Sequence, residues 1–467
     1  MRHTFDPTIL REYDIRGVFG ETLGPDDARA IGRSFGTRVA AIGGRRVVVG
    51  YDGRLSSPIL EHALVEGLNA SGIDAVRIGM GPTPMLYYAE ASVPDVQGGI
   101  QVTGSHNPAN HNGFKMVLEG SAFFGADIID LGRIADEGRW VSGTGHTADL
   151  AIMDAYVDRL VEGLNGIDKA ALEGLSIAWD TGNGAAGPVV EALTARLPGN
   201  HVLLFTSVDG HFPNHHPDPT VESNLADLVQ AVARGSLDFG VAFDGDGDRI
   251  GAIDGNGQTI WGDQLLAIFA EDVLAISPNA RIIGDVKCSS ALFDQISQLG
   301  GQPEMWKTGH SLIKSRMKET GALLGGEMSG HVCFADRYYG FDDALYAAVR
   351  LIAATVRLDR TVAALRSTMP AMVNTPELRF QVDETRKFAI VREVAGRLRD
   401  ENARMNDIDG VRVDTPDGWW LLRASNTQDV LVVRAESRTK EGLARLLQQA
   451  DAQLAVSGVV RGEQFGH

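Results

Sequence analysis

The hexapeptide Thr103-Gly-Ser-His-Asn-Pro108 is the stretch that decides how the chain is interpreted. It follows the short apolar run 98–102, which predicts a β-strand. A hydroxyl on a glycine-containing turn at the end of a strand is where an α/β sheet presents chemistry. Ser105 is therefore a candidate nucleophile, but a serine at neutral pH needs a base, a metal ion or a nearby cation to react. Since Ser, Asn and Pro are turn residues, an ordinary turn is the alternative at this point.

A second segment, Asp244-Gly-Asp-Gly-Asp-Arg249, supplies a means of activation. It follows the predicted strand 237–243. Alternate residues of an extended turn point the same way, so the carboxylates of Asp244, Asp246 and Asp248 can converge on one hard divalent cation. Without a cation, the three would repel and raise each other's pKa. An EF-hand loop needs glycine at its sixth position and glutamate at its twelfth, where this chain has arginine and glycine. The segment therefore predicts a Mg²⁺ site, with a solvated acidic turn as the alternative.

The cations near these two segments point to phosphoryl transfer. The planar guanidinium of Arg249 suits a phosphoryl group, and a metal ion beside an arginine recurs at phosphoryl-transfer sites. A metal ion would stabilise the Ser105 oxygen as attacking or leaving group. Lys115 would neutralise charge on the moving phosphate. Together these residues predict a serine that carries a phosphoryl group.

The composition of the whole chain limits the class of protein. Its 467 residues predict roughly three domains, and 44% hydrophobic residues are ample for several cores. No run approaches the roughly 18 apolar residues of a membrane span. We see no signal peptide at the start, and the two cysteines fit a reducing compartment. We therefore expect a cytoplasmic protein without a membrane partner.

The formal charge of −18 argues against a nucleic-acid partner, because such a protein needs a basic stripe. It does not exclude an anionic small substrate, since charges are screened over about 8 Å at physiological salt. Basic residues do stand in or beside the motif segments: Arg16, Lys115, Arg249, Lys287, His310 and Arg423.

The order of apolar runs predicts three similar α/β units. Each of the segments 47–52, 175–180 and 281–286 is an apolar run that reaches an aspartate and leads into a turn and a helix. This recurrence fits doubly wound α/β domains, whose ligands lie at the carboxyl ends of strands. We also expect helices at 26–42, 60–70, 126–136 and 149–164, a turn at 12–17, and a break in the chain at 81–85.

The character of the chain changes near residue 370. A predicted helix at 385–398 is followed by strand-like runs and a last helix near 440–454, which indicates an α+β domain. The predicted fold is thus three related doubly wound mixed α/β domains plus a C-terminal α+β domain around a central cleft. The predicted domain limits are 1–150, 151–256, 257–370 and 371–467.

Two further polar segments are candidate substrate loops. Glu327-Met-Ser-Gly-His331 follows a strand-like run and offers donors and acceptors for sugar hydroxyls. Arg423-Ala-Ser-Asn-Thr427 offers a guanidinium, two hydroxyls and backbone N–H groups, which can hold a phosphate. Taken alone, the first segment is equally typical of a polar surface turn, and the alternative for the second is a Ser/Thr-rich turn between strands. If both Ser105 and the 423–427 loop hold phosphate, the C-terminal domain must close over the N-terminal cleft.

The four segments in this order resemble the α-D-phosphohexomutases, and the resemblance runs from Tyr13 to the final helix. The nearest branch is the bacterial phosphomannomutase/phosphoglucomutases. The resemblance implies a phosphorylated Ser105 and Mg²⁺ held by Asp244, Asp246, Asp248 and a phosphoserine oxygen. It implies these substrate contacts: Tyr13, Arg16, Lys287, His310, Glu327, Ser329, Arg423, Ser425, Asn426 and Thr427. Lys115 and His331 are the candidates for proton transfer.

The implied reaction has two phosphoryl transfers. Phospho-Ser105 gives its phosphoryl group to a hexose phosphate, and the resulting 1,6-bisphosphate, which is also the expected activator, turns over and returns its other phosphate. The expected substrates are mannose and glucose phosphates, and the protein is expected to be a monomer or weak homo-oligomer. The alternatives are a phosphoglucosamine mutase, a phosphatase acting through phospho-Ser105, and a catalytically silent sugar-phosphate-binding protein.

Overall fold

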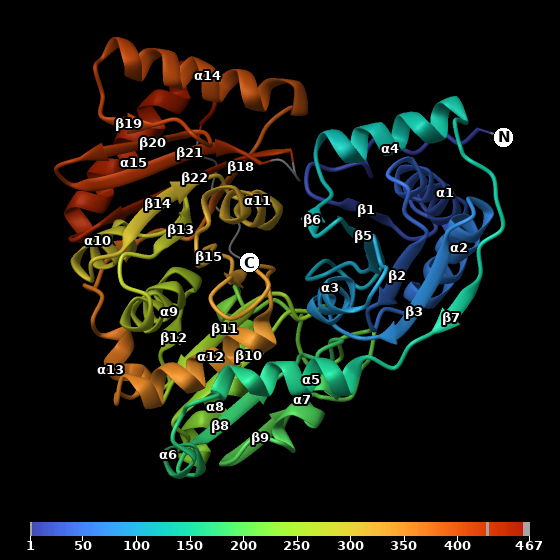
Figure 1. Ribbon diagram of the computed structural model, residues 1–467. Coiled ribbons are helices and arrows are strands. Elements are labelled where there is room, and N and C mark those ends of the chain that lie inside the picture. Colours follow the sequence, from blue (N-terminus) through green and yellow to red (C-terminus); the bar gives the residue numbers. More distant parts are fainter. Residues whose placement is uncertain (1, 426–428, 461–467) are drawn as a thin grey trace.

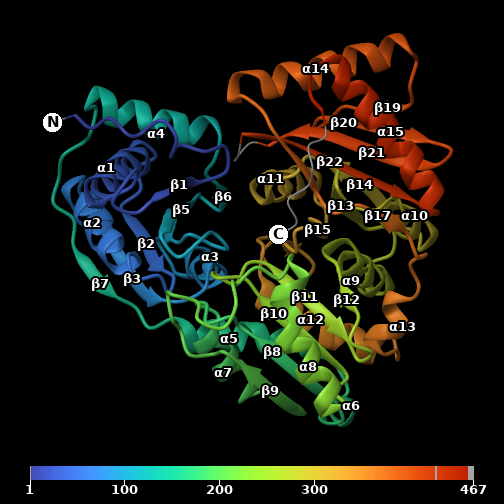
Figure 2. The ribbon, with the colours of Figure 1, turned by 180° about the vertical axis from the view of Figure 1, so that it is seen from behind.

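The computed structural model describes residues 2–425 and 429–460. Four bodies follow one another along the chain and around the molecule, from the blue N-terminal body through green and yellow to the red C-terminal body (Figure 1). The reverse view shows the same order (Figure 2). Each body contains its own β-sheet. The predicted fold class, three mixed α/β domains followed by an α+β domain, is confirmed.

The first α/β domain has strand order β1-β5-β4-β2-β3-β7, with β6 beside β5. Its strands are β1 Ile15–Val18, β2 Arg46–Tyr51, β3 Asp74–Met80, β4 Gly98–Val102, β5 His111–Leu118, β6 Ser121–Ala122 and β7 Thr147–Asp149. Its helices are α1 Pro25–Ala41, α2 Ser57–Ala70, α3 Thr83–Ser92 and α4 Ala126–Glu137. Helices α1 and α2 cross closely at glycines, because a Cβ on Gly32 would stand 2.2 Å from the carbonyl oxygen of Leu64.

The second α/β domain has strand order β12-β11-β10-β8-β9. Its strands are β8 Ser176–Asp180, β9 Asn200–Leu204, β10 Phe239–Phe243, β11 Ile250–Asp254 and β12 Thr259–Ile260. Its helices are α5 Met153–Val161, α6 Lys169–Glu173, α7 Gly187–Thr194 and α8 Ala226–Gly235, with 3-10 turns at Glu162–Leu164 and Glu222–Leu225.

The third α/β domain has strand order β14-β13-β15-β16. Its strands are β13 Arg281–Asp285, β14 Gln302–Trp306, β15 Leu324–Gly326 and β16 Val332–Phe334. Its helices are α9 Gly262–Ile276, α10 Ser290–Gln298, α11 His310–Thr320, α12 Ala344–Arg357 and α13 Val362–Arg366. One continuous apolar core runs from Met85 of α3 through Trp179 of β8 to Phe334 of β16, so the α/β domains are packed together rather than strung on linkers.

The C-terminal domain has strand order β17-β22-β21-β20-β19, with β18 also beside β22. Its strands are β17 Val373–Asn374, β18 Leu378–Gln381, β19 Met405–Asn406, β20 Val411–Thr415, β21 Gly418–Ala424 and β22 Val430–Ser437, and its helices are α14 Glu384–Asp400 and α15 Lys440–Val456. It has a core of its own. Arg412 joins it to the third domain by donating to the carbonyl oxygens of Val286 and Cys288, both at 2.7 Å.

The three α/β domains share one arrangement of strands. In each, a strand that leads to an aspartate pairs in parallel with a second strand, and an antiparallel strand follows: β2 with β4 then β5, β8 with β10 then β11, and β13 with β15 then β16. The segments 103–108, 244–249 and 327–331 begin directly after β4, β10 and β15. Three of the candidate loops therefore occupy the same position in three repeats.

Three local predictions are wrong. The segment 81–85 does not break the chain but contains the start of α3, because Pro84 lies in the first turn, where its missing N–H removes no helical hydrogen bond. The segment 12–17 enters strand β1 rather than only turning. The predicted helix 149–164 begins only at Met153, since Asp149 ends the edge strand β7 beside β3 and a short connection follows. No described helix is long and apolar enough to cross a bilayer.

Candidate active site

Ser105 follows β4 and points at the acidic triplet of the neighbouring domain. Its Oγ donates to Asp244 Oδ2 at 2.8 Å. The residue has a left-handed backbone, with φ of +49°, which is uncommon for a residue other than glycine. The residue is only 1% exposed, because the second domain covers it. A Cβ on Gly245 would stand 2.5 Å from the Ser105 carbonyl oxygen, so only glycine permits this approach.

The three aspartates of the loop after β10 converge as predicted. Asp244, Asp246 and Asp248 are all fully buried, and one carboxylate oxygen from each lies within 4.8 Å of the others. Asp244 Oδ1 accepts hydrogen bonds from the backbone N–H groups of Asp248 and Arg249, both at 3.1 Å. The loop thus closes on its own first carboxylate and directs all three inward.

Charge in the triplet is balanced in part by Lys115 on β5. Its Nζ donates to Asp246 Oδ2 at 2.7 Å and to Asp248 Oδ2. Burial and the two neighbouring carboxylates raise the pKa of Asp244 well above its usual value, and burial together with Asp246 raises the pKa of Asp248. Burial opposes the ammonium, but Asp246 and Asp248 outweigh it and raise the pKa of Lys115. Lys115 is therefore a firmly held cation.

The donor set fits a divalent metal ion. Within the described part of the chain, Asp246 Oδ1 and Asp248 Oδ1 are buried and accept no hydrogen bond. A buried carboxylate oxygen without a partner is costly, and a hard cation with oxygen ligands satisfies it. Asp244, Asp246 and Asp248 are thus a group that could hold a metal ion beside the Ser105 hydroxyl.

Arg249 connects the metal loop to the loop after β15. Its backbone forms an antiparallel bridge with His331, and its Nε donates to His331 Nε2 at 3.0 Å. Because an arginine N–H only donates, His331 Nε2 is the acceptor and the ring carries its proton on Nδ1. That Nδ1 lies 2.9 Å from Asp342 Oδ2, so the negative carboxylate favours a proton on that nitrogen.

His310 and His331 form a stacked pair beside Asp342. Their ring centroids are 4.9 Å apart, and His310 Nδ1 lies 3.2 Å from Asp342 Oδ2. Burial and Arg249 lower the pKa of His331 to about 4, and burial and Lys314 lower the pKa of His310 to about 4. Both rings are therefore neutral near pH 7, so Nε2 of His331 can accept a proton.

The loop 327–331 turns a carboxylate toward the start of α11. Glu327 Oε1 accepts from the Gly309 N–H at 2.7 Å, and Ser329 is half-buried. Burial and then Asp285 raise the pKa of Glu327 to about 7, against the effect of Lys287. Asp285 also anchors the loop, since its Oδ1 accepts from the Met328 N–H at 3.3 Å.

The remaining candidate cations are Lys287 of the third domain and Arg423 of the C-terminal domain. Lys287 Nζ donates to Glu377 Oε1 at 3.1 Å, and Arg423 Nε donates to Asp409 Oδ2 at 3.2 Å. Ser425 ends the described part of that loop, and the predicted residues Asn426 and Thr427 lie outside the described residues.

Tyr13 reaches this region from the first domain, the domain in which Arg16 also lies. Tyr13 OH donates to the carbonyl oxygen of Thr308 at 2.8 Å, across the border with the third domain. Arg16 Nε donates to Asp14 Oδ2 at 2.7 Å. The tyrosine ring also lies against Gly309, the residue before the candidate His310, because a Cβ on Gly309 would stand 2.6 Å from the ring.

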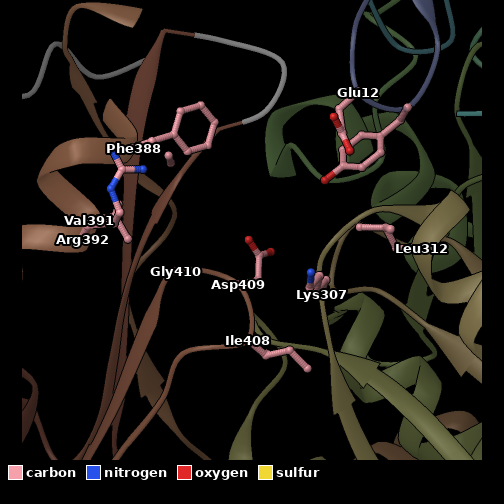
Figure 3. Close-up of a pocket in the computed structure, with 11 residues that line it drawn as sticks. Glu12, Lys307, Leu312, Phe388, Val391, Arg392, Ile408, Asp409 and Gly410 are labelled. Atoms are coloured by element: carbon pink, nitrogen blue, oxygen red, sulfur yellow. The ribbon is translucent and has the colours of Figure 1, made fainter. Parts of the chain in front are cut away.

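A cavity of about 290 Å³ opens beside Asp409, the residue that Arg423 contacts. Figure 3 shows Phe388 and Arg392 of α14 on one side of it and Glu12 and Leu312 on the other. Its lining comes from the first, third and fourth domains: Glu12, Tyr13, Lys307, Leu312, Phe388, Val391, Arg392, Ile408, Asp409, Gly410 and Ala424. The C-terminal domain thus faces the first domain across a space of small-molecule size.

Sequence reasoning missed the residues that hold the loops. Asp52 and Asp285 were noticed only as strand ends, although the recurrence of such an aspartate was a usable signal. Asp342 and Asp218, which lies 2.9 Å from His106 Nδ1, belong to no motif, so nothing in their spacing reveals them. Arg54 was also missed, and it contacts the Ser105 loop directly.

Four family models match the chain in order. They are the phosphoglucomutase/phosphomannomutase α/β/α domains I, II and III over residues 7–133, 154–257 and 261–372, and the C-terminal domain over residues 377–453. The chain belongs to the phosphoglucomutase/phosphomannomutase family. The α-D-phosphohexomutase resemblance seen in the sequence is thereby confirmed.

Similar proteins share nearly the whole length of this family member. A phosphomannomutase/phosphoglucomutase of Pseudomonas aeruginosa is 44% identical over 443 residues, which cover 95% of this chain and 94% of that protein. A phosphoglucomutase of Neisseria gonorrhoeae is 42% identical, with 94% and 95% of the two chains covered. The crystal structure of a phosphoglucomutase/phosphomannomutase family protein from Burkholderia thailandensis is 44% identical, covers 97% of this chain and 98% of its own, and superposes with a TM-score of 0.91.

Proposed function

We propose that this protein interconverts hexose 1-phosphates and hexose 6-phosphates, with mannose and glucose as the sugars, through a phosphoserine at Ser105. One observation carries the proposal: the buried Ser105 hydroxyl donates to Asp244 inside a cluster of three carboxylates suited to a metal ion. Family membership supports the sugar-phosphate substrate, since relatives that are 42–44% identical are named phosphomannomutase/phosphoglucomutase or phosphoglucomutase.

The proposed roles follow from what each residue can donate or accept. Asp244, Asp246, Asp248 and an oxygen of phospho-Ser105 would hold Mg²⁺. When bound, a divalent cation would neutralise charge on the Ser105 oxygen and the phosphoryl group. Lys115 and Arg249 add positive charge to the transferring group. The proposed contacts to the sugar and to its second phosphate are Tyr13, Arg16, Lys287, His310, Glu327, Ser329, Arg423, Ser425, Asn426 and Thr427.

The first proposed step forms the bisphosphate. The bond between phosphorus and the Ser105 oxygen breaks as a bond between phosphorus and the sugar oxygen forms, and the sugar hydroxyl proton passes to Nε2 of neutral His331. For this, the substrate hydroxyl takes the place of Arg249 at Nε2. Asp342 stabilises the imidazolium that results, because its Oδ2 lies beside Nδ1.

The second proposed step is the reverse at the other end of the sugar. The hexose 1,6-bisphosphate turns over in the cleft and returns its second phosphoryl group to Ser105, and His331 gives its proton to the sugar oxygen that loses phosphorus. The net result is an isomerisation. Free bisphosphate would act as an activator because it rephosphorylates Ser105 when the intermediate escapes. A fixed site for the non-reacting phosphate explains why Arg423 lies in a separate domain from Ser105.

A coupled mutase assay on mannose 1-phosphate and glucose 1-phosphate, with and without the 1,6-bisphosphate, tests the proposal. We expect turnover of both sugars, activation by the bisphosphate and one phosphate on Ser105 by intact mass. Turnover of glucosamine 6-phosphate alone would instead identify a phosphoglucosamine mutase. Inorganic phosphate released faster than isomerised sugar would identify a phosphatase. Binding of sugar phosphate without either reaction would identify a catalytically silent binding protein.

The predictions about domain limits, location and partners rest on the sequence. We propose the domain limits 1–150, 151–256, 257–370 and 371–467, a cytoplasmic location, and a monomer or weak homo-oligomer without a nucleic-acid partner. Sedimentation of the purified protein tests the oligomeric state.

A further inference from the structure

Arg54 lies beneath the Ser105 loop, two residues after the aspartate that follows β2. It is 1% exposed, and it belongs to none of the candidate motifs. Phe212, from a loop of the second domain, covers it with its ring centroid 5.4 Å from the guanidinium carbon. A buried arginine without a fixed set of acceptors would be strongly destabilising, so its partners indicate what it does.

The guanidinium of Arg54 donates to four carbonyl oxygens of the segment that runs from Ser105 to His111, the first residue of β5. Nη2 donates to Ser105 and Asn107, both at 2.6 Å. Nη1 donates to Pro108 at 2.6 Å and to His111 at 2.9 Å. A guanidinium has five N–H donors, and Nε uses the fifth on Asp52 Oδ2 at 3.2 Å. All five donors therefore have an acceptor, and four of these acceptors are main-chain atoms of the loop that carries Ser105.

Asp52 also accepts hydrogen bonds from the loop that carries Ser105. Its Oδ2 accepts from Thr103 Oγ1 at 2.8 Å and from the Gly104 N–H at 3.2 Å, and its Oδ1 accepts from the Arg54 N–H at 3.0 Å. The Thr103 hydroxyl oxygen in turn accepts from the Ser105 N–H at 2.9 Å. Both the N–H and the carbonyl of Ser105 are thus fixed through this pair.

The backbone of Ser105 needs such a hold. A left-handed conformation costs a non-glycine residue roughly 1–2 kcal/mol, so a free loop would leave it. The hydrogen bond from Arg54 fixes the carbonyl of that residue. Because the C=O and N–H of a trans peptide point in opposite directions, it also turns the His106 N–H away from Arg54.

We propose that Arg54, held by Asp52, is the positioning residue that keeps Ser105 in its left-handed conformation with its hydroxyl toward Asp244. The inference rests on the proposed role of Ser105 as the phosphoryl carrier. Arg54 does not touch the reacting atoms and acts through the loop. Lysine cannot replace it, since an ammonium has only three donors and lacks the planar fork that spans four carbonyls.

The test compares Arg54→Lys with wild type in the mutase assay and in single-turnover transfer from glucose 1,6-bisphosphate to dephosphorylated protein, followed by intact mass. A displacement of about 1 Å of a reacting group costs about 100-fold in rate, so we expect kcat and the transfer rate to fall about 100-fold. KM should stay within about threefold. Guanidinium ion should restore part of the activity of Arg54→Ala, which a loss of folding would not allow.

The matched control is Arg350→Lys. Arg350 is equally buried and donates to Asp272 and Asp336 at 2.8 Å each, away from the Ser105 loop. The Arg350→Lys substitution should lower the melting temperature, and kcat measured below the unfolding transition should be unchanged. If Arg54→Lys does not fold, Gly104→Ala replaces it, because the added methyl would stand 2.5 Å from Cζ of Arg54 and displace the same group.

The outcomes separate this inference from the proposed function. Wild-type protein that never takes up a phosphate on Ser105 would overturn the proposed mechanism, and the inference with it. Wild-type protein that is phosphorylated normally, together with an Arg54→Lys or Gly104→Ala protein whose kcat lies within threefold of wild type, would overturn the inference alone. So would a kcat that falls only in proportion to the folded fraction.

Discussion

Lys115 and a divalent cation should compete for the same carboxylates, and substituting Lys115→Met exposes the competition. The Lys115 ammonium donates to both Asp246 and Asp248. Methionine has a similar length and no charge, so the substitution leaves three fully buried carboxylates without this cation. We expect the metal-free variant to be much less stable than wild type, and Mg²⁺ to restore much of the difference.

The magnitude follows from the burial of the pair. Removing one partner of a buried ion pair costs roughly 3–5 kcal/mol. At roughly 2–4 °C per kcal/mol for a unit of 150–250 residues, the apparent melting temperature without metal should fall by about 10 °C. A ligand at 100 times its dissociation constant returns about 2.7 kcal/mol. Mg²⁺ should therefore raise the melting temperature of Lys115→Met by several degrees more than that of wild type.

Thermal unfolding with EDTA and over a Mg²⁺ titration measures both effects. Lys314→Met is the matched control, because Lys314 Nζ donates to the fully buried Asp342 at 2.7 Å outside the acidic triplet. It should lower the melting temperature without gaining extra stabilisation from Mg²⁺. Equal Mg²⁺-induced shifts in wild type and Lys115→Met would refute the reasoning, as would an unchanged melting temperature of Lys115→Met in EDTA.

Three further outcomes are expected. Asp244→Asn should lower kcat at least about a thousandfold, because it removes a carboxylate from the proposed metal site. It should not lower the melting temperature in EDTA, because burial and the neighbouring carboxylates raise the pKa of Asp244 and the substitution removes its charge. Activity within tenfold of wild type would contradict this. Ser105→Ala should carry no phosphate by intact mass and show no turnover, and a phosphate found at another residue would disprove the assignment. Glu327→Gln should raise the melting temperature at pH 8 but not at pH 4. Burial, then Asp285, raises the pKa of Glu327 from 4.5 to about 7, so between these pH values the folded protein keeps a proton that the unfolded chain releases. The stability of the wild-type protein therefore falls by about 3 kcal/mol as the pH rises from 4.5 to 7. Equal melting curves of the two proteins at pH 8 would rule this out.

The sequence predicted the parts of the site that consist of side chains in short segments. The carboxylates 244, 246 and 248 converge because their spacing and the intervening glycines permit little else. Ser105 was found because it lies in the turn that follows an apolar strand. The residues that hold these groups were not found, because their partners are main-chain atoms or lie in distant segments. Arg54 binds carbonyl oxygens, which every residue has, so no pattern of residue types marks it.

The errors in local structure have a similar origin. Helix α3 was missed because proline was treated as a breaker, whereas in the first turn it is compatible with a helix. Burial of Ser105 could not be predicted, since it depends on how the loop after β10 of another domain covers it. Propensity and spacing describe a segment by itself, and these features arise only where segments from different domains meet.

The equivalent positions of the loops after β4, β10 and β15 have a consequence for how this enzyme family tolerates change. Because the proposed nucleophile, the proposed cation-binding carboxylates and Glu327 lie in similar strand–loop units of three different domains, no single unit contains the whole candidate site. The proposed catalysis therefore depends on the contacts that hold the three units together. Sequence drift at a border far from the loops, such as the contact of Lys318 with Ser121, should alter turnover while leaving every reacting side chain intact.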